Sequence, residues 1–249
     1  MYRRDGPLGL NSVAVSPDGL SAYAASSNSD AVAVFDRAED GTLTQKPGTA
    51  GCIQDASTLE DPCLEGTAVR RPQSVTVSPD GSSVYVTSIS HAVAIFDRAP
   101  NGRLFQKPDP FGCISEDAAG LPCIDGTALD RPVSVTVSPD GLSVYVASDF
   151  DDAVAVFDRA PNGTLAQKPG TAGCIREAAS GRRCVAGAAL LSTSWVAVSP
   201  DGLSVYVTSE GSDAVAVFDR EPNHRRRSRR RGSLADSSLP PALRSGPSR

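Results

Sequence analysis

The feature that most constrains this chain is an internal repeat of about sixty residues. The segment SVTVSPDG stands at 74–81 and again at 134–141, with near copies at 12–19 and 195–202. The prolines of the four copies are 62, 60 and 61 residues apart, and further shared segments follow each copy. One structural unit therefore occurs four times. An array of this kind folds as one cooperative body, so chain length alone would miscount the domains.

Each unit is predicted to form four short antiparallel strands. In the second unit these are residues 74–78, 83–88, 92–98 and 102–107. Valine, tyrosine and phenylalanine favour strands, and the intervening SPDG and APNG segments contain the residues typical of tight turns. Strands that follow one another through short turns form a meander. We expect the loops after the second strands and the linkers to lie at one end, and the SPDG and APNG turns at the other.

The third strand of the unit indicates how the sheets pack. In AVAVFD at 153–158 both faces are apolar, whereas a sheet with one wet face would alternate apolar and polar residues. The fourth strand is more polar, as suits an outer edge. These patterns predict an all-β protein, a β-propeller with four blades present and the last one incomplete. A β-solenoid is the alternative, although its coils are usually much shorter. The expected blades are residues 12–73, 74–133, 134–194 and, in part, 195–220.

The strand and turn segments also resemble a known family. VSPDGLSVYVTS at 198–209 and DAVAVFDR at 213–220 are similar to the YVTN-type repeats of bacterial lactonase-like β-propellers. The resemblance covers residues 12–220 and implies the propeller fold. The family includes propellers similar to 6-phosphogluconolactonase and to muconate-lactonizing enzymes, alongside surface proteins with no assigned chemistry. For the enzymes it implies a cluster of His, Arg and Glu at the channel mouth. His91 is the only histidine of residues 1–220, so that cluster cannot be transferred residue by residue.

Six cysteines lie in pairs at matched positions of three linkers. We expect disulfides in each linker, because a long connection without strands needs something to hold it. Zinc binding is the alternative, but zinc sites favour closer cysteine spacing or added histidines. Disulfides indicate an oxidising compartment, which is the periplasm, the cell surface or the medium. The expected pairs are Cys52–Cys63, Cys113–Cys123 and Cys174–Cys184.

The two ends of the chain depart from the repeat. Residues 221–249 carry eight arginines and two acids, a net charge of +6, which leaves −5 − 6 = −11 for residues 1–220. This tail is predicted to be disordered, and it is either a frame-shift product or a genuine basic segment. The acidic body argues against nucleic acid as a partner, and no segment could span a membrane. The chain begins within a linker, so we expect a fragment whose open end blades self-associate.

Candidate site residues are those that differ between units, because recurring residues build the architecture. His91 replaces an acid in the loop after the second strand, where an exposed loop histidine is the alternative interpretation. Asp149, Asp151 and Asp152 offer oxygens to a hard cation or form a solvated acidic loop. Trp195 replaces a serine of the other units and either stacks on a flat ligand or packs against neighbours.

Two functions follow from these observations. The first is a secreted or surface-exposed propeller that binds an extracellular ligand, carbohydrate or protein, as a scaffold. The alternative is a lactonase-like hydrolase or isomerase whose site is incomplete in this chain. No Ser-His-Asp order, HExxH, P-loop or dinucleotide fingerprint occurs. No cofactor and no metal are expected.

Overall fold

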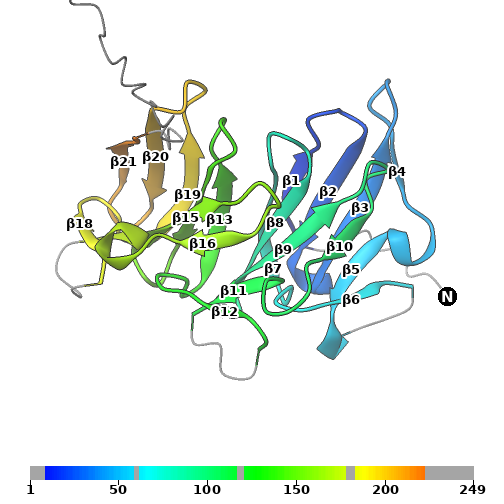
Figure 1. Ribbon diagram of the computed structural model, residues 1–249, viewed down its shortest axis with the longest axis horizontal. Helices are drawn as coiled ribbons and strands as arrows, with labels where there is room; N and C mark the ends of the chain where they lie inside the picture. Colours follow the sequence, from blue (N-terminus) through cyan, green and yellow to red (C-terminus); the bar gives the residue numbers. More distant parts are fainter. Residues whose placement is uncertain (1–8, 59–61, 117–120, 178–182, 222–249) are drawn as a thin grey trace, which may run out of the picture.

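A computed structural model describes residues 9–58, 62–116, 121–177 and 183–221. These residues form four sheets, which lie side by side in chain order from the N-terminal sheet to the C-terminal one (Figure 1). The protein is a four-blade β-propeller, as the repeat predicts. The predicted disorder of the arginine-rich tail concerns residues that, except for Glu221, lie outside the described ones. No helix among the described residues is long and apolar enough to cross a membrane.

The strands of the four sheets have the following bounds. The first sheet contains β1 (Leu10–Val15), β2 (Ser21–Ser26), β3 (Ala31–Arg37), β4 (Leu43–Gln45), β5 (Cys52–Asp55) and β6 (Leu64–Gly66). The second contains β7 (Pro72–Val77), β8 (Ser83–Ser88), β9 (Ala92–Arg98), β10 (Leu104–Gln106), β11 (Cys113–Ser115) and β12 (Ile124–Asp125). The third contains β13 (Pro132–Val137), β14 (Ser143–Ser148), β15 (Ala153–Arg159), β16 (Leu165–Gln167), β17 (Cys174–Glu177) and β18 (Val185–Gly187). The fourth contains β19 (Thr193–Val198), β20 (Ser204–Ser209) and β21 (Ala214–Asp219).

The fourth strand of the meander differs from the prediction, because it is split into two pieces. In the second sheet, β10 pairs with the end of β9 and β11 pairs with its beginning. The chain loops out between them, yet Ile95 keeps backbone bonds to both sides, to Lys107 N at 3.1 Å and Gly112 O at 2.9 Å. β12 then adds in parallel to β11. The linker that was expected to lack strands therefore supplies two short ones.

Successive sheets pack through two faces of unlike composition. The face that carries the tyrosine of the second strand meets the valine-rich face of the next sheet. Between the first two sheets, Tyr23, Val32 and Val34 pack with Val84 and Phe96. All of these side chains are at most 1 % exposed, so the contact is as dry as a protein core. The same arrangement recurs between the second and third sheets and between the third and fourth.

An arginine at the end of the third strand ties each sheet to the preceding one. Arg98 Nε donates to the Tyr23 hydroxyl at 2.7 Å, and Arg98 Nη2 donates to Asp18 Oδ2 at 2.7 Å. The Tyr23 hydroxyl in turn donates to the Gly102 carbonyl at 2.8 Å. We call this Arg–Tyr–Asp group the inter-sheet clasp. It recurs in the two other interfaces as Arg159–Tyr85–Asp80 and Arg220–Tyr145–Asp140.

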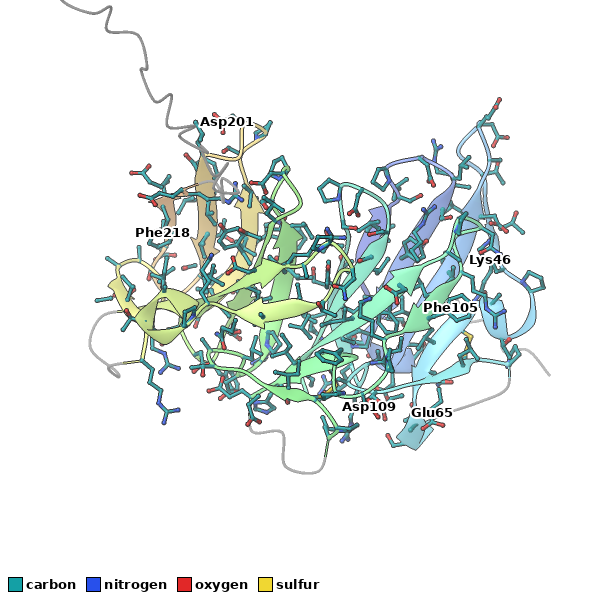
Figure 2. The ribbon with its side chains drawn as sticks, viewed as in Figure 1. Lys46, Glu65, Phe105, Asp109, Asp201 and Phe218 are labelled. Carbon is teal, nitrogen blue, oxygen red and sulfur yellow. A yellow bond between two sulfur atoms is a disulfide. The ribbon has the colours of Figure 1, made fainter. Side chains whose placement is uncertain are left out.

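The clasps and the linkers lie at opposite rims. Each clasp uses the aspartate of an SPDG turn, and Asp201 of the last such turn stands at the upper tip of the fourth sheet (Figure 2). At the other rim, the loop after the second strand bonds to the linker that precedes its own sheet. Asp149 N donates to Arg131 O at 3.1 Å, and Glu210 N donates to Ser192 O at 3.0 Å. The expected separation of turns and linkers is therefore confirmed.

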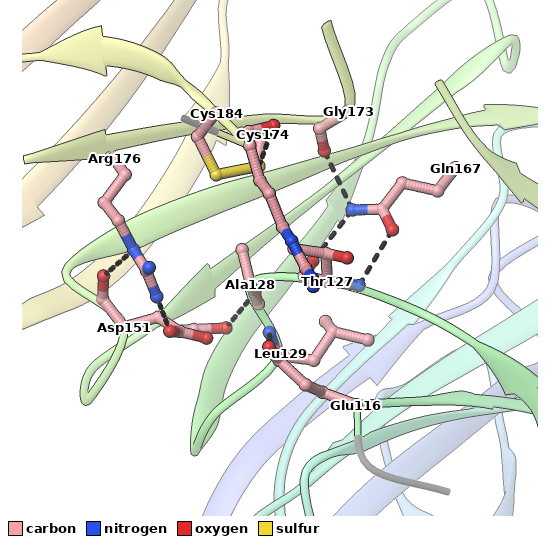
Figure 3. Close-up of a disulfide and its surroundings, with 12 residues drawn as sticks. Glu116, Thr127, Ala128, Leu129, Asp151, Gln167, Gly173, Cys174, Arg176 and Cys184 are labelled. Atoms are coloured by element: carbon pink, nitrogen blue, oxygen red, sulfur yellow. Dashed lines mark hydrogen bonds and ion pairs between the residues drawn. A yellow bond between two sulfur atoms is a disulfide. The ribbon is translucent and has the colours of Figure 1, made fainter. Parts of the chain in front are cut away.

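The cysteines pair as predicted, in Cys52–Cys63, Cys113–Cys123 and Cys174–Cys184. Each disulfide joins the first residue of β5, β11 or β17 to the residue directly before the short strand that pairs with it in parallel, which is β6, β12 or β18. Near Cys174–Cys184, the Gln167 side chain bonds both the amide and the carbonyl of Thr127, at 2.9 and 2.7 Å (Figure 3). The linker from one sheet is thereby held to the outer edge of the next. The three disulfides indicate an oxidising compartment.

Replacing Cys113 and Cys123 together by alanine should lower the free energy of unfolding by about 3 kcal/mol, because the closed loop no longer restrains the unfolded chain. Urea denaturation of the variant and of the oxidised protein measures the loss. The wild-type protein in reductant is the control and should lose more, since it loses all three bonds. An unchanged midpoint in the variant would contradict a stabilising role for this disulfide.

Replacing Arg159 by methionine should cost about 2–3 kcal/mol, because the variant loses hydrogen bonds from a buried charge to Tyr85 and Asp80. Arg37 stands at the equivalent place of the first sheet, which has no preceding sheet among the described residues. The Arg37→Met variant is therefore the matched control and should change the unfolding free energy little. Both are measured by urea denaturation in dilute solution. Losses of equal size at a concentration where the protein is monomeric would show that the bonds of Arg159 to Tyr85 and Asp80 contribute nothing.

The carboxylate of Asp18, which is bonded mainly within its own turn, should also make stability depend on pH in the acid range. The hydrogen bond from Ser16, the Leu20 amide and Arg98 together lower the pKa of Asp18 to about 2, against an ordinary value of 3.8. A carboxylate whose pKa is lower in the folded state stabilises that state fully at pH values above its unfolded pKa. This contribution to stability is lost as the pH falls through the folded pKa. The urea midpoint should therefore fall between pH 4 and pH 2. In Asp18→Asn the midpoint at pH 7 should be lower and this fall shallower; an identical pH profile would exclude Asp18 as its source.

Candidate functional site

The candidate site centres on His91, which occupies a left-handed backbone position at the linker rim. Its φ is +60°, and the equivalent residues Asp30, Asp152 and Asp213 have φ values between +48° and +52°. Aspartate and histidine tolerate this conformation better than most residues. Two of these carboxylates accept a backbone amide of the following linker, from Arg71 at 2.8 Å and from Ser192 at 2.7 Å. His91 therefore stands where the other sheets use a linker-binding acid.

The His91 side chain faces an aspartate of the following linker. Its Nδ1 lies 3.0 Å from Asp130 Oδ1, and the two side chains are 49 % and 39 % exposed. The pair is within ion-pair distance, although Asp130 Oδ1 lies outside hydrogen-bond geometry. The backbone of His91 is fixed, because its carbonyl accepts from Glu116 N at 2.9 Å and from Ser115 Oγ at 3.1 Å. The ring is thus presented to solvent from a rigid support.

Two adjoining hollows open beside this histidine and share Arg71, Ile89 and His91. One has a volume of about 440 Å³ and is also lined by Arg70, Ser115 and Glu116. The other has a volume of about 520 Å³ and reaches the innermost strand β7 at Gln73. Its remaining lining residues are Asp130, Arg131 and Phe150. The hollows therefore lie at the rim where the innermost strands begin.

The cations of the site differ in how they are held. Arg131 lies over the Phe150 ring at 4.6 Å and forms an ion pair with Asp149 at 3.3 Å. No bond from the side chain of Arg71 to another described residue is observed, and the residue is exposed. An anionic group entering the hollows would therefore meet Arg71 without displacing an existing partner. Such a group is best held by guanidinium, which bonds carboxylate and phosphate in a planar, two-pronged manner.

The acidic loop that follows β14 does not converge on a common point. Asp149 pairs with Arg131, while Asp151 pairs with Arg176 and accepts the Asp130 amide at 2.8 Å (Figure 3). Asp152 accepts the Ser192 amide at 2.7 Å. None of the three acids lines the hollows at His91; Asp149 is connected to them through Arg131, and Asp151 through the amide of Asp130. The described residues include no group of three or more His, Cys, Asp or Glu side chains that could hold a metal ion.

Trp195 lies elsewhere, on the fourth sheet. It pairs with Thr208 and is 52 % exposed on the face that turns away from the third sheet. In the other sheets, the serine at this place accepts an amide of the next sheet: Ser12 from Val75 at 3.2 Å, Ser74 from Val135 at 3.3 Å and Ser134 from Val196 at 3.2 Å. Trp195 therefore marks the outermost face of the array and lines neither hollow at His91.

Sequence reasoning missed the residues that surround His91. Arg71, Asp130 and Arg131 come from linkers, and the fold brings them to a loop of the intervening sheet. A weak signal existed, because an Arg-Pro pair ends two linkers, at 71–72 and at 131–132, whereas the third ends differently at 192–193. Only the path of the linkers across the rim reveals that these arginines meet the odd histidine.

Comparison with known proteins adds to this geometry. No family model and no curated relative matches the chain. Among solved structures, the periplasmic gluconolactonase of Pseudomonas aeruginosa is 26 % identical, with a TM-score of 0.54 over 86 % of this chain and 50 % of its own. A candidate 6-phosphogluconolactonase of Bacteroides fragilis is 20 % identical, with a TM-score of 0.58 over 88 % of this chain and 53 % of its own. The fold is that of the lactonase-like β-propellers.

The same fold also serves other chemistry. Hydrazine synthase of Kuenenia stuttgartiensis is 19 % identical, with a TM-score of 0.54 over 88 % of this chain and 48 % of its own. The chain thus spans about half the length of the solved chains that it matches. Likeness at this level describes the fold, so the activity of this propeller has to be argued from its site.

Proposed function

We propose that this lactonase-like propeller hydrolyses a small sugar lactone in the hollows beside His91. The observation that carries the proposal is the placement of an exposed histidine 3.0 Å from a carboxylate, next to the exposed Arg71. His91, Arg71 and Glu116 also line one hollow, and these are the residue types that the family resemblance implies for its enzymes. The substrate class follows from Arg71, which favours an acidic or phosphorylated sugar.

The reaction needs a base, a stabiliser of the oxyanion and an acid. His91 takes a proton from a water molecule that attacks the lactone carbonyl, and Asp130 stabilises the imidazolium that forms. Arg71 stabilises the negative charge on the carbonyl oxygen in the transition state. The ring C–O bond then breaks, and the leaving alkoxide takes the proton from His91. The product is the open hydroxy acid, and no redox change occurs.

Glu116 has a positioning role in this proposal. Its Oε2 accepts the Leu129 amide at 2.5 Å, and Glu177 makes the same bond to Leu190 at 2.6 Å in the next sheet. Because Glu177 makes this bond in a sheet that has no histidine at the place of His91, the bond belongs to the architecture of the repeat. Glu116 therefore holds the linker that carries Asp130 and Arg131.

The comparisons favour the hydrolase over the binding scaffold that was the first interpretation of the sequence. Three of the matched structures carry lactonase names, which supports the hydrolase. We place the protein in the periplasm or outside the cell. This location is supported by the three disulfides and by the periplasmic location in the name of one matched protein.

The test is the hydrolysis of glucono-δ-lactone and of its 6-phosphate by the full 249-residue chain, followed by acid release above the spontaneous rate. His91→Asn should abolish the catalysed rate, because asparagine tolerates the left-handed backbone but cannot accept the proton. Asp130→Asn should lower kcat about 10-fold or more. Arg71→Gln should lower kcat with both lactones, because the oxyanion loses its stabiliser, and should also raise KM for the phosphorylated one.

Asn28→Ala is the matched control, because Asn28 lies exposed in the equivalent loop of the first sheet. It should leave the rate unchanged. A wild-type rate equal to the spontaneous rate with both lactones, or full activity in His91→Asn, would refute the proposed function. Binding of either sugar without turnover would point back to the scaffold interpretation.

A further inference from the structure

Both end sheets of the array expose an apolar face. On the first sheet, Val13 and Val15 of β1 are 58 % and 51 % exposed. On the fourth sheet, Tyr206 is 41 % exposed, and Val215 and Val217 are each 58 % exposed. The strand register puts Tyr206 opposite Val217, so these residues share a single face with Trp195. Contiguous apolar patches of this kind mark interaction surfaces.

These two faces are the unlike halves of one contact that the chain already contains three times. The fourth-sheet face repeats the residues Tyr85, Val93 and Ile95, which are fully buried against the third sheet. The first-sheet face repeats Val135, Val137 and Phe157, which cover them. Val135 is 5 % exposed in that contact, whereas Val13, its counterpart, is 58 % exposed. The exposed face of the fourth sheet is therefore complementary to the exposed face of the first sheet in another copy of the chain.

The polar clasp is also split between the two ends. Arg37 donates to the Gly19 carbonyl at 3.1 Å, as the other clasp arginines do to their own turns, but it reaches no tyrosine or aspartate of another described sheet. At the other end, Asp201 accepts Ser199 Oγ at 2.5 Å and Leu203 N at 2.9 Å, the turn bonds shared by the clasp aspartates. Arg37 therefore carries the donor half of a clasp, and Tyr206 with Asp201 carries the acceptor half.

We propose that a second copy of this chain docks head to tail on both open faces, with Arg37 of each copy bonded to Tyr206 and Asp201 of the other. A two-fold axis makes both contacts at once and closes a ring of eight sheets, which is the upper end of the range for propellers. Two copies together have about the length of one of the matched solved chains, of which this chain spans about half. The inference goes beyond the proposed hydrolase function and does not depend on it.

Trp195 makes this contact differ from the three internal ones. The serine that accepts the next sheet's amide is replaced by an indole, so that hydrogen bond is absent and a large, half-exposed apolar side chain stands on the innermost strand of the face. Tryptophan is enriched among the residues that contribute most to the affinity of an interface. Trp195 is also the only tryptophan of the chain, so its fluorescence reports this contact alone.

The test is sedimentation equilibrium of the full 249-residue chain over a wide concentration range. The expected mass is twice the 25.8 kDa of one chain. Val15→Asp on the first sheet and Val217→Asp on the fourth should each raise the dissociation constant on the order of 100-fold, because a charge would be buried in an apolar contact. Phe105→Asp is the control and should leave the mass unchanged, since Phe105 is exposed on the outer edge of the second sheet (Figure 2).

Fluorescence gives an independent readout on the same samples. Emission of Trp195 should shift to shorter wavelength as the wild-type protein associates, and this shift should be absent in Val15→Asp, whose change lies on the other face. A monomer at every concentration overturns the proposal. Disruption by only one of the two valine variants would mean that a face pairs with itself, and a ladder of larger species would mean that the ring does not close; both outcomes overturn the two-copy ring.

Discussion

Each sheet of this protein is held to the one before it by a guanidinium that has been removed from water. The clasp arginines Arg98, Arg159 and Arg220 have side chains only 5, 3 and 3 % exposed. A buried charge is tolerated only where it is paired and hydrogen-bonded. Valine and alanine faces alone would allow neighbouring sheets to slide, whereas a guanidinium that must reach one tyrosine and one aspartate permits a single register. Because the arginine always comes from the later sheet, the clasp also gives the array a direction.

Much of this architecture could be predicted from the sequence, because each strand and turn pattern occurs in all four units and can be compared between them. The three inner strands of each sheet, the turns and all three disulfides follow from the residues. The split outer strand could not be predicted, since β10 and β11 are each three residues long and too short to show a period. The clasp arginines recur in every unit, so the sequence indicates only that they belong to the architecture. Their partners lie about eighty residues earlier, at a distance that no local pattern measures.

The candidate site was only partly predictable. His91 could be singled out because it breaks a repeated acid, but Asp130 and Arg71 could not, since their position depends on how the linkers cross the rim. The acidic loop indicated a cation site that the fold does not assemble. Asp151 and Asp152 are adjacent in sequence, yet Asp151 binds the amide of Asp130 and Asp152 binds the amide of Ser192. In a repeat protein, a residue that differs between units indicates a candidate site. The residues that the fold brings next to it determine the chemistry of that site.

The disulfides have a consequence for how such a chain can be made. Each one joins cysteines only 10 or 11 residues apart and stays within one sheet. The oxidised chain therefore contains no covalent link between distant segments, and every unit can be sealed as soon as its own residues are available. Growth of the array requires only that each new sheet find the one just completed, a search over short sequence distances. Locally closed units suit a protein that has to fold progressively from its N-terminus.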